Sequence, residues 1–222
     1  MPSPRGVFAA FVAVCAVNVV AVGVGLEPVA TATKPFIVGL LLVWAWLATD
    51  RRPPRLLMAG LAFALLGDVL FELPGTLAFL AGIVAFLVMQ VCYIRGFLRL
   101  GAGAWLRDRP VVVVGWALLW VALNVALGPL LGELRWPITV YSLALVAMAA
   151  CALATGSRLV GVGGVLFLVS DLLIGLRAAD VSIPASGVLV MATYAAAQVL
   201  ITVGWVALAR SRQGAQPAVV TG

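Results

Sequence analysis

The sequence contains no histidine and only three cysteines among its 222 residues. Histidine is the commonest general base and the commonest nitrogen ligand of zinc, so its absence argues against a zinc hydrolase. Cys15, Cys92 and Cys151 are far apart in the sequence and each lies within an apolar run, where cysteine packs as a small hydrophobic residue. We therefore expect no metal site, no cofactor and no disulfide framework.

Charged residues are also scarce. They make up 10% of the chain, whereas hydrophobic residues make up 64% and the mean hydropathy is +1.20. Soluble domains carry about 25% charged residues. The net charge of +6 does not indicate a nucleic-acid partner, because the basic residues are scattered between apolar runs rather than gathered in a patch. The composition predicts a multi-pass protein of the cell membrane, forming one integral membrane domain over residues 1–222.

The apolar runs are long enough to cross a bilayer as helices, and charged residues, proline or glycine separate them. The first run also resembles a signal peptide, but the seven spans that follow favour an uncleaved first helix. The sequence therefore predicts an all-α bundle of eight transmembrane helices. The expected spans are 7–26, 35–49, 55–72, 75–98, 111–131, 137–155, 159–176 and 184–209.

Charge sets the expected orientation of these spans. If eight helices alternate in direction, 11 of the 14 basic residues fall on one side of the membrane. Cytoplasmic loops are the ones enriched in lysine and arginine, so both termini are expected in the cytoplasm. The pattern also leaves open two four-helix repeats of the same orientation. The residue pairs that suggest the repeats are Asn18 with Asn124, Asp68 with Asp171, and Gln90 with Gln198.

Two spans carry acidic residues where ionised groups are costly. Asp68 and Glu72 lie one turn apart near the outer end of the third span, and Ser170 and Asp171 lie at a similar level in the seventh. An aspartate at the bilayer centre costs about 2.5–3.5 kcal/mol on insertion scales, so such residues usually face the bundle interior and have a function. We predict that these carboxylates line a polar cavity open to the outer side.

Other polar residues reach the same half of the membrane. Each also has a purely structural interpretation: Glu72 as a hydrated interfacial residue, Lys34 as a snorkelling anchor, and Tyr194 with Gln198 as interhelical hydrogen-bonding partners. A binding role near the cavity remains the alternative. The candidates are Lys34, Glu72, Gln90, Tyr93, Arg135, Ser170, Tyr194 and Gln198.

Six short motifs follow one another in the order found in a known family. They are "KPF" (34–36), "LLGDVLF" (65–71), "AGIVAFLVMQVCYIRGF" (81–97), "RWPI" (135–138), "GGVLFLVSD" (163–171) and "TYAAAQVLI" (193–201). Together they resemble the YhhN-like lysoplasmalogenase family of multispanning membrane proteins, over residues 34–201. The resemblance implies hydrolysis of the vinyl-ether bond of a lysophospholipid-like substrate, giving a fatty aldehyde and a glycerophospho-alcohol. One departure is that the family usually has histidine where this chain has Gln90, which cannot exchange a proton near neutral pH.

That reaction suits paired carboxylates. A vinyl ether is cleaved by protonation of its β-carbon, which leaves an oxocarbenium ion to which water adds. Desolvation and mutual repulsion favour one protonated and one ionised carboxyl group, so one can act as the acid while the other stabilises the cation. We therefore expect Asp68 and Asp171 to be the catalytic pair, without assigning the acid. Lys34, with Arg135 as a weaker candidate, is expected to bind the substrate phosphate.

Two further classes of function stay open from the sequence. A small proton-coupled or lipid transporter would also carry intramembrane carboxylates, but it would need a path to the cytoplasmic side, where ionisable groups are few. A non-catalytic lipid-binding protein would use the aspartates only for helix packing. A serine lipase is disfavoured because no Gly-x-Ser-x-Gly motif is present. The sequence does not indicate an oligomeric state.

Overall fold

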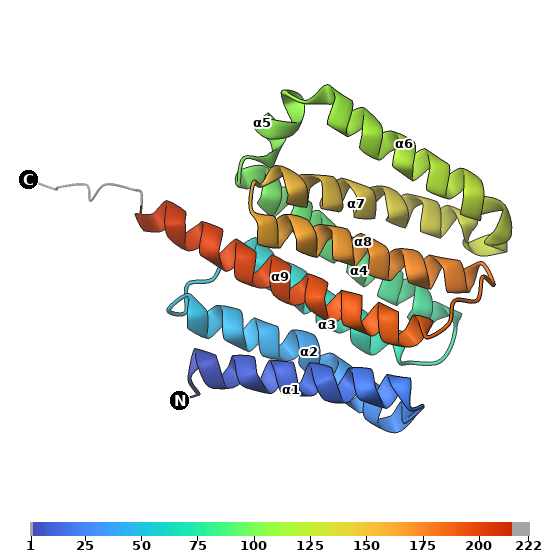
Figure 1. The fold of residues 1–222 in the computed structure, drawn as a ribbon, viewed down its shortest axis with the longest axis horizontal. Coiled ribbons are helices and arrows are strands. Elements are labelled where there is room, and N and C mark those ends of the chain that lie inside the picture. Colours follow the sequence, from blue (N-terminus) through green and yellow to red (C-terminus); the bar gives the residue numbers. More distant parts are fainter. Residues whose placement is uncertain (1, 215–222) are drawn as a thin grey trace, which may run out of the picture.

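Proline and serine mark the starts of several helices. Pro4, Pro28 and Pro110 lie in the first turn of their helices, where a backbone N–H has no partner to lose. The Ser3 hydroxyl accepts a hydrogen bond from the Gly6 N–H (3.1 Å). In the computed structural model, which describes residues 2–214, the elements are α1 (Pro4–Gly23), α2 (Glu27–Ala48), α3 (Arg55–Phe71), α4 (Thr76–Arg99), α5 (Ala102–Arg107), α6 (Pro110–Leu127), the 3₁₀ turns η1 (Gly128–Leu130) and η2 (Gly132–Leu134), α7 (Arg135–Ala154), α8 (Arg158–Ala178) and α9 (Ser186–Gly214) (Figure 1).

The protein is all-helical over its described residues, and seven of its helices are long and apolar enough to cross a membrane. These are α1, α2, α4, α6, α7, α8 and α9, with the spans of α6 and α7 extended by the η turns to Pro110–Leu130 and Gly132–Ala154. Helix α3 has 17 residues and is not among the seven. Every predicted span coincides with one long helix, whereas the crossing of the membrane by α3, and so the count of eight, stays a prediction.

Helix α2 begins earlier than the sequence suggested. We expected a short span starting at Pro35, but α2 starts at Glu27 and keeps Pro35 inside it. A proline in a helix interior removes one backbone hydrogen bond, and transmembrane helices tolerate this where neighbouring groups compensate. As a consequence Lys34 lies within the helix rather than at its first residue.

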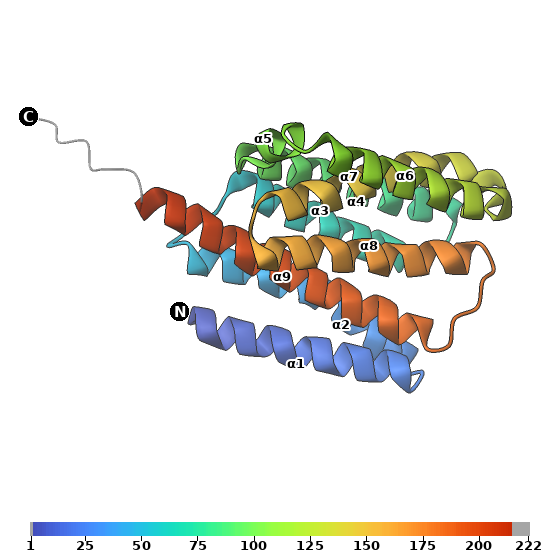
Figure 2. The same ribbon diagram turned by 45° about the horizontal axis from the view of Figure 1, so that its top comes forward.

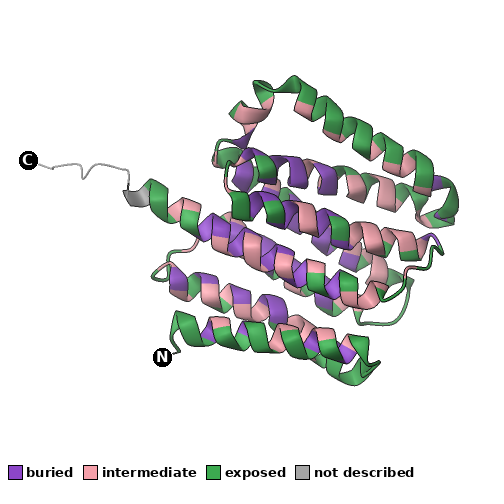
Figure 3. Cartoon of the chain, viewed as in Figure 1, coloured by how far each residue is buried: buried purple, intermediate pink, exposed green. Residues whose placement is uncertain are grey.

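Six helices form a closed ring. Taken in the order α2, α3, α4, α7, α8 and α9, each helix packs against the next, and α9 packs back against α2 (Figures 1 and 2). Helix α1 lies outside the ring against α2 and α9, and α6 lies outside it against α7. No residue of α6 is buried, as Figure 3 also shows.

Small residues let α8 and α9 approach closely. A Cβ on Gly163 would lie 2.9 Å from the backbone nitrogen of Ile201, and one on Gly204 would lie 3.0 Å from that of Val160. Membrane helices associate through such small residues because packing, rather than water exclusion, holds them together. This contact fixes how far α9 sits from α8, and it thereby places Tyr194 against the interior of the ring.

Candidate functional site

A cavity of about 110 Å³ lies inside one end of the ring. All six ring helices contribute to its wall: α2 through Lys34, α3 through Asp68, α4 through Phe86, and the other three through polar residues described below. Most of the wall is apolar. The complete lining is Lys34, Asp68, Phe71, Phe79, Ile83, Phe86, Ile138, Tyr141, Ser170, Asp171, Ile174, Gly175, Ala178, Val190, Met191 and Tyr194.

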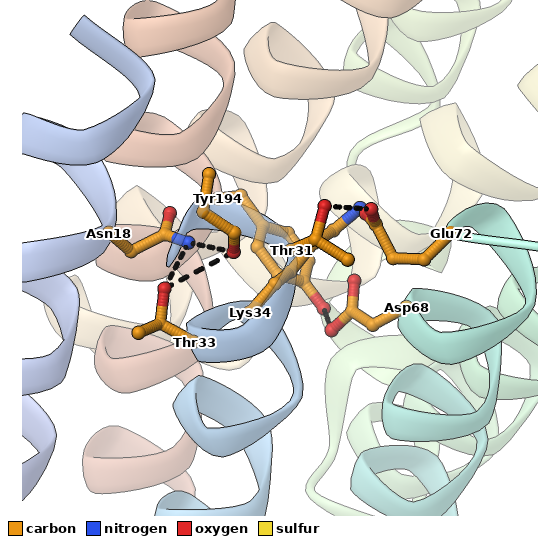
Figure 4. Close-up of polar contacts among 8 residues, drawn as sticks. Asn18, Thr31, Thr33, Lys34, Asp68, Glu72 and Tyr194 are labelled. Carbon is orange, nitrogen blue, oxygen red and sulfur yellow. Dashed lines mark hydrogen bonds and ion pairs between the residues drawn. The ribbon is translucent and has the colours of Figure 1, made fainter. Parts of the chain in front are cut away.

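Asp68 points into this cavity from α3 and is 2% exposed. The Tyr194 hydroxyl of α9 donates a hydrogen bond to Asp68 Oδ2 (2.7 Å), as Figure 4 shows. The ammonium group of Lys34 and the carboxylate of Glu72 both act on Asp68 electrostatically. Asp68 therefore has one hydroxyl donor and one nearby positive charge.

Asp171 faces the same cavity from α8. The Tyr141 hydroxyl of α7 donates a hydrogen bond to Asp171 Oδ2. Asp171 also interacts electrostatically with Asp68, and no cation acts appreciably on it. The neighbouring Ser170 hydroxyl donates to the Val190 carbonyl of α9 (3.1 Å), so Ser170 joins two helices rather than orienting Asp171. Two carboxyl groups thus share one small cavity, each with its own tyrosine.

An ion pair lies at the mouth of the cavity between α2 and α3. Lys34 Nζ lies 2.7 Å from Glu72 Oε1, and the Thr31 hydroxyl donates to Glu72 Oε2 (2.8 Å) (Figure 4). Partial burial works against ionisation of Glu72. The hydrogen bonds from Lys34 and Thr31, together with the Lys34 charge, nevertheless hold the pKa of Glu72 below its ordinary value of 4.5.

The lowered pKa of Glu72 predicts a pH-dependent contribution to stability. The folded state favours ionised Glu72, so the ion pair stabilises it at any pH above about 4.5, the ordinary value for this carboxyl group. The contribution is lost as the pH falls through the lowered folded value. We expect Glu72→Gln to reduce the unfolding free energy by about 0.5–1 kcal/mol at pH 7 and by nothing well below pH 4. Melting of both proteins between pH 3 and 8 measures this, and a difference that stays constant over that range would contradict it.

A second polar layer lies deeper in the ring. The Tyr93 hydroxyl of α4 donates to Gln198 Oε1 (3.0 Å), and Gln198 Nε2 donates to the Tyr194 hydroxyl (3.4 Å). Through Tyr194 this layer is linked to Asp68. Gln90 is fully buried and its amide lies close to the Tyr141 hydroxyl, but no hydrogen bond of good geometry forms between its amide atoms and another described residue. The chain has three tyrosines, and each of them donates a hydrogen bond to a polar side chain of the cavity or of this deeper layer.

Aromatic rings fill the interior below this layer. The Tyr93 and Trp205 ring centroids are 5.6 Å apart, and those of Phe97 and Trp205 are 4.9 Å apart. All three side chains are at most 3% exposed. The Trp205 ring lies directly against Gly96, which has no side chain to exclude it. The cavity is therefore open toward one end of the bundle and packed solid toward the other.

Most of the candidate residues meet at this cavity. Lys34, Asp68, Ser170, Asp171 and Tyr194 line it. Glu72 binds Lys34 at its mouth, while Tyr93, Gln90 and Gln198 lie in or beside the deeper layer. Arg135 does not line it: it is exposed, and its guanidinium lies 5.7 Å from the Trp136 ring.

Tyr141 was not predicted. Tyr141 could have been found in the same way as Tyr194, because each is a tyrosine inside an apolar span. Its pairing with Asp171 depends on how α7 and α8 are rotated against each other, which no spacing within either helix specifies. Among residues 2–214, no three histidine, cysteine, aspartate or glutamate side chains come together to offer a metal site.

This arrangement of two carboxyl groups and two tyrosine hydroxyls is suited to proton transfer in an apolar site. Two carboxyl groups in one apolar cavity cannot both ionise without cost. Hydroxyl groups hold one oxygen of each carboxyl and leave the other free to face a ligand. The ammonium group of Lys34, paired with Glu72, lies at the mouth of the same cavity.

Comparison with known proteins agrees with this description. Proteins named lysoplasmalogenase from Mycobacterium bovis and Mycobacterium tuberculosis are each 36% identical to this chain over 160 residues. The match covers 69% of this chain and 61% of each relative, so it spans about three fifths of their length. No solved structure matches. The model of the YhhN family matches residues 29–205, a segment that contains every residue lining the cavity, and the chain therefore belongs to the YhhN family.

Proposed function

We propose that this protein is a membrane-embedded hydrolase that cleaves the vinyl-ether bond of lysoplasmalogen-type lipids. The observation that carries the proposal is the pair of carboxyl groups, Asp68 and Asp171, which face one apolar cavity and are each held by a tyrosine hydroxyl. The names of the two mycobacterial relatives support the substrate class. The substrate is a lysophospholipid that reaches the cavity from the bilayer.

The reaction uses the two carboxyl groups in turn. The protonated one transfers its proton to the β-carbon of the vinyl ether, and the ether oxygen shares the resulting positive charge. The ionised one stabilises this oxocarbenium ion, as carboxylates do in glycosidases. Water then adds to the carbon beside the oxygen and returns a proton to a carboxylate. The hemiacetal that results breaks into a fatty aldehyde and the glycerophospho-alcohol.

The position of Lys34 supports one division of the two roles. Lys34 lies near Asp68 and favours its ionised form, whereas no cation stabilises an ionised Asp171. We therefore assign Asp171 as the acid and Asp68 as the stabilising carboxylate. Tyr194 and Tyr141 orient them, and Gln198, itself held by Tyr93, orients Tyr194. Lys34 binds the substrate phosphate, which displaces Glu72 from it.

The proposed topology has eight crossings, with α3 as a short third one and both termini on the cytoplasmic side of the cell membrane. In support, α1 begins and α9 ends at the same end of the bundle, as an even number of crossings requires (Figures 1 and 2). The ring order also supports a duplicated four-helix unit. A half-turn of the ring exchanges α2 with α7, α3 with α8 and α4 with α9, and it thereby exchanges Asp68 with Asp171.

Aldehyde release tests the proposed function directly. Purified protein in detergent is incubated with lysoplasmenylethanolamine, and the products are identified by mass spectrometry. In D₂O, proton transfer to the β-carbon places one deuterium on the carbon next to the aldehyde carbonyl. An aldehyde that carries this deuterium is the expected product. An aldehyde without this deuterium would exclude protonation at carbon, and no aldehyde from folded protein would exclude the hydrolase.

A further inference from the structure

A second cavity, of about 60 Å³, adjoins the central one on the side of α6. It lies between α6, α7 and α8, and we call it the α6 groove. Its wall is mostly apolar and rich in leucine, and two of its polar residues, Asn124 and Ser142, are hydrogen-bonded to each other (3.2 Å). The residues shared by the groove and the central cavity are Ile138, Tyr141, Asp171 and Gly175. The carboxyl group assigned as the acid therefore lies where the two cavities meet.

Gly175 lines both cavities, and we call the space beside it the passage between them. Other glycines of α8 are required for packing: a Cβ on Gly163 would lie 2.8 Å from Ile201 Cγ1, and one on Gly164 would lie 2.5 Å from Ala152 Cβ. A Cβ on Gly175 would meet no atom within 4 Å, and its backbone is ordinary helix. Glycine weakens a helix relative to alanine, so close packing does not account for this residue. The missing side chain of Gly175 leaves space on this face of α8.

The α6 groove faces the lipid. Helix α6 has no buried residue, and among the long helices its main packing partner is α7. We infer that a lipid chain reaches the groove beneath α6 from the bilayer. The central cavity is far smaller than the roughly 300–1,000 Å³ of sites that enclose a drug-sized ligand. A lipid whose head binds Lys34 and whose reactive bond lies between the aspartates must place its hydrocarbon chain elsewhere. The passage at Gly175 leads from that bond to an apolar groove.

We propose that the α6 groove receives the part of the substrate's hydrocarbon chain next to the reactive bond, while the rest of the chain extends into the bilayer because the groove, at about 60 Å³, is too small to enclose it, and that Gly175 determines which chains pass. This inference rests on the proposed function for the position of the head and the reactive bond. This part of the chain runs from Asp171 past Gly175 and lies between α6 and α8. Gly175 is a specificity-determining residue, because the absence of its side chain admits a long chain beside the acid.

Gly175→Leu tests chain selection by activity. A Cβ at position 175 meets no neighbour within 4 Å, and the rest of a leucine side chain would occupy the space between the two cavities. Melting of the variant checks that the fold is kept. We expect kcat/KM for a lysoplasmenylethanolamine with an 18-carbon chain to fall at least tenfold, and that for a 4-carbon chain to change less than twofold. Gly115→Leu is the matched control, because Gly115 lies on exposed α6 and its Cβ would also meet no atom. Equal loss for both chain lengths, or no loss for either, would overturn the assignment of Gly175.

Photo-crosslinking tests the groove without any turnover. The probe is an alkyl-ether lysophosphoethanolamine, which has no vinyl ether to cleave, with a diazirine in the part of its chain next to the ether bond. We expect crosslinks to peptides of α6 and α7 that contain Leu123, Leu127 or Leu145, and their loss in Gly175→Leu but not in Gly115→Leu. Crosslinks elsewhere, or crosslinks unaffected by Gly175→Leu, would overturn the proposal. If the protein releases no aldehyde, the proposed function fails while this binding result still stands.

Discussion

Replacing Asp68 with asparagine is expected to lower kcat for vinyl-ether cleavage by about 10²–10⁴-fold, the usual contribution of a charged or proton-transferring catalytic group. Asparagine keeps the shape and an oxygen that can accept the Tyr194 hydrogen bond. It removes the charge that stabilises the oxocarbenium ion. Because a buried carboxylate is costly and its neutral isostere is not, the variant should melt at the same temperature as the parent or above it.

Matched variants separate chemistry from folding in this experiment. Asp171→Asn is expected to lose activity to a similar degree, and the double variant to lose little more than either single one, because the two groups act as a unit. Asp108→Asn, at an exposed helix end, is the control and should retain full activity. Full activity in Asp68→Asn would remove Asp68 from the mechanism. If activity falls only as far as the amount of folded protein falls, both aspartates serve only in helix packing.

The sequence predicted well how deep each residue lies in the membrane, but it did not predict which way each residue faces around the bundle. Apolar runs and their proline and glycine breaks located every long helix, because lipid forces each span to satisfy its backbone internally. Position along a span then placed Asp68 and Asp171 at one level. Whether they face each other depends on how the ring closes, through contacts such as that of Gly163 with Ile201, and no local spacing encodes those contacts.

The errors have the same origin. Pro35 was taken as the start of a helix because proline usually begins or breaks one, but in a membrane neighbouring groups compensate for its missing hydrogen bond. Tyr141 was passed over because its partner comes from another helix. Short α5 was not predicted either, since six residues give too little periodicity to detect. Tertiary contacts decided each of these features.

Adding a single methyl group at Gly96 is expected to destabilise the protein by about 1–3 kcal/mol, the usual cost of overpacking a filled core. A Cβ on Gly96 would lie 2.0 Å from Trp205 Cη2 and Cζ2. Trp205 cannot easily give way, because Phe97 and Tyr93 pack against its ring and only 3% of it is exposed. Thermal melting of Gly96→Ala in detergent measures the effect.

The control for this prediction is a substitution that we expect to stabilise the protein rather than destabilise it. A Cβ on Gly39 of α2 would meet no atom within 4 Å, so Gly39→Ala should gain helix stability and melt at or above the parent temperature. Trp205→Phe in the Gly96→Ala background removes the clashing ring atoms and should restore part of the loss. Equal melting of Gly96→Ala and Gly39→Ala would show that this end of the ring is loosely packed.

The aromatic packing at Gly96 also bears on function, because Tyr93 belongs both to it and to the polar network. Tyr93 packs against Trp205 and donates its hydroxyl to Gln198, which holds the tyrosine bound to Asp68. A shift of Trp205 therefore reaches Asp68 through three hydrogen bonds. If Gly96→Ala stays folded, we expect kcat to fall while KM stays unchanged, because the positioning of Asp68 is altered and the mouth at Lys34 is not.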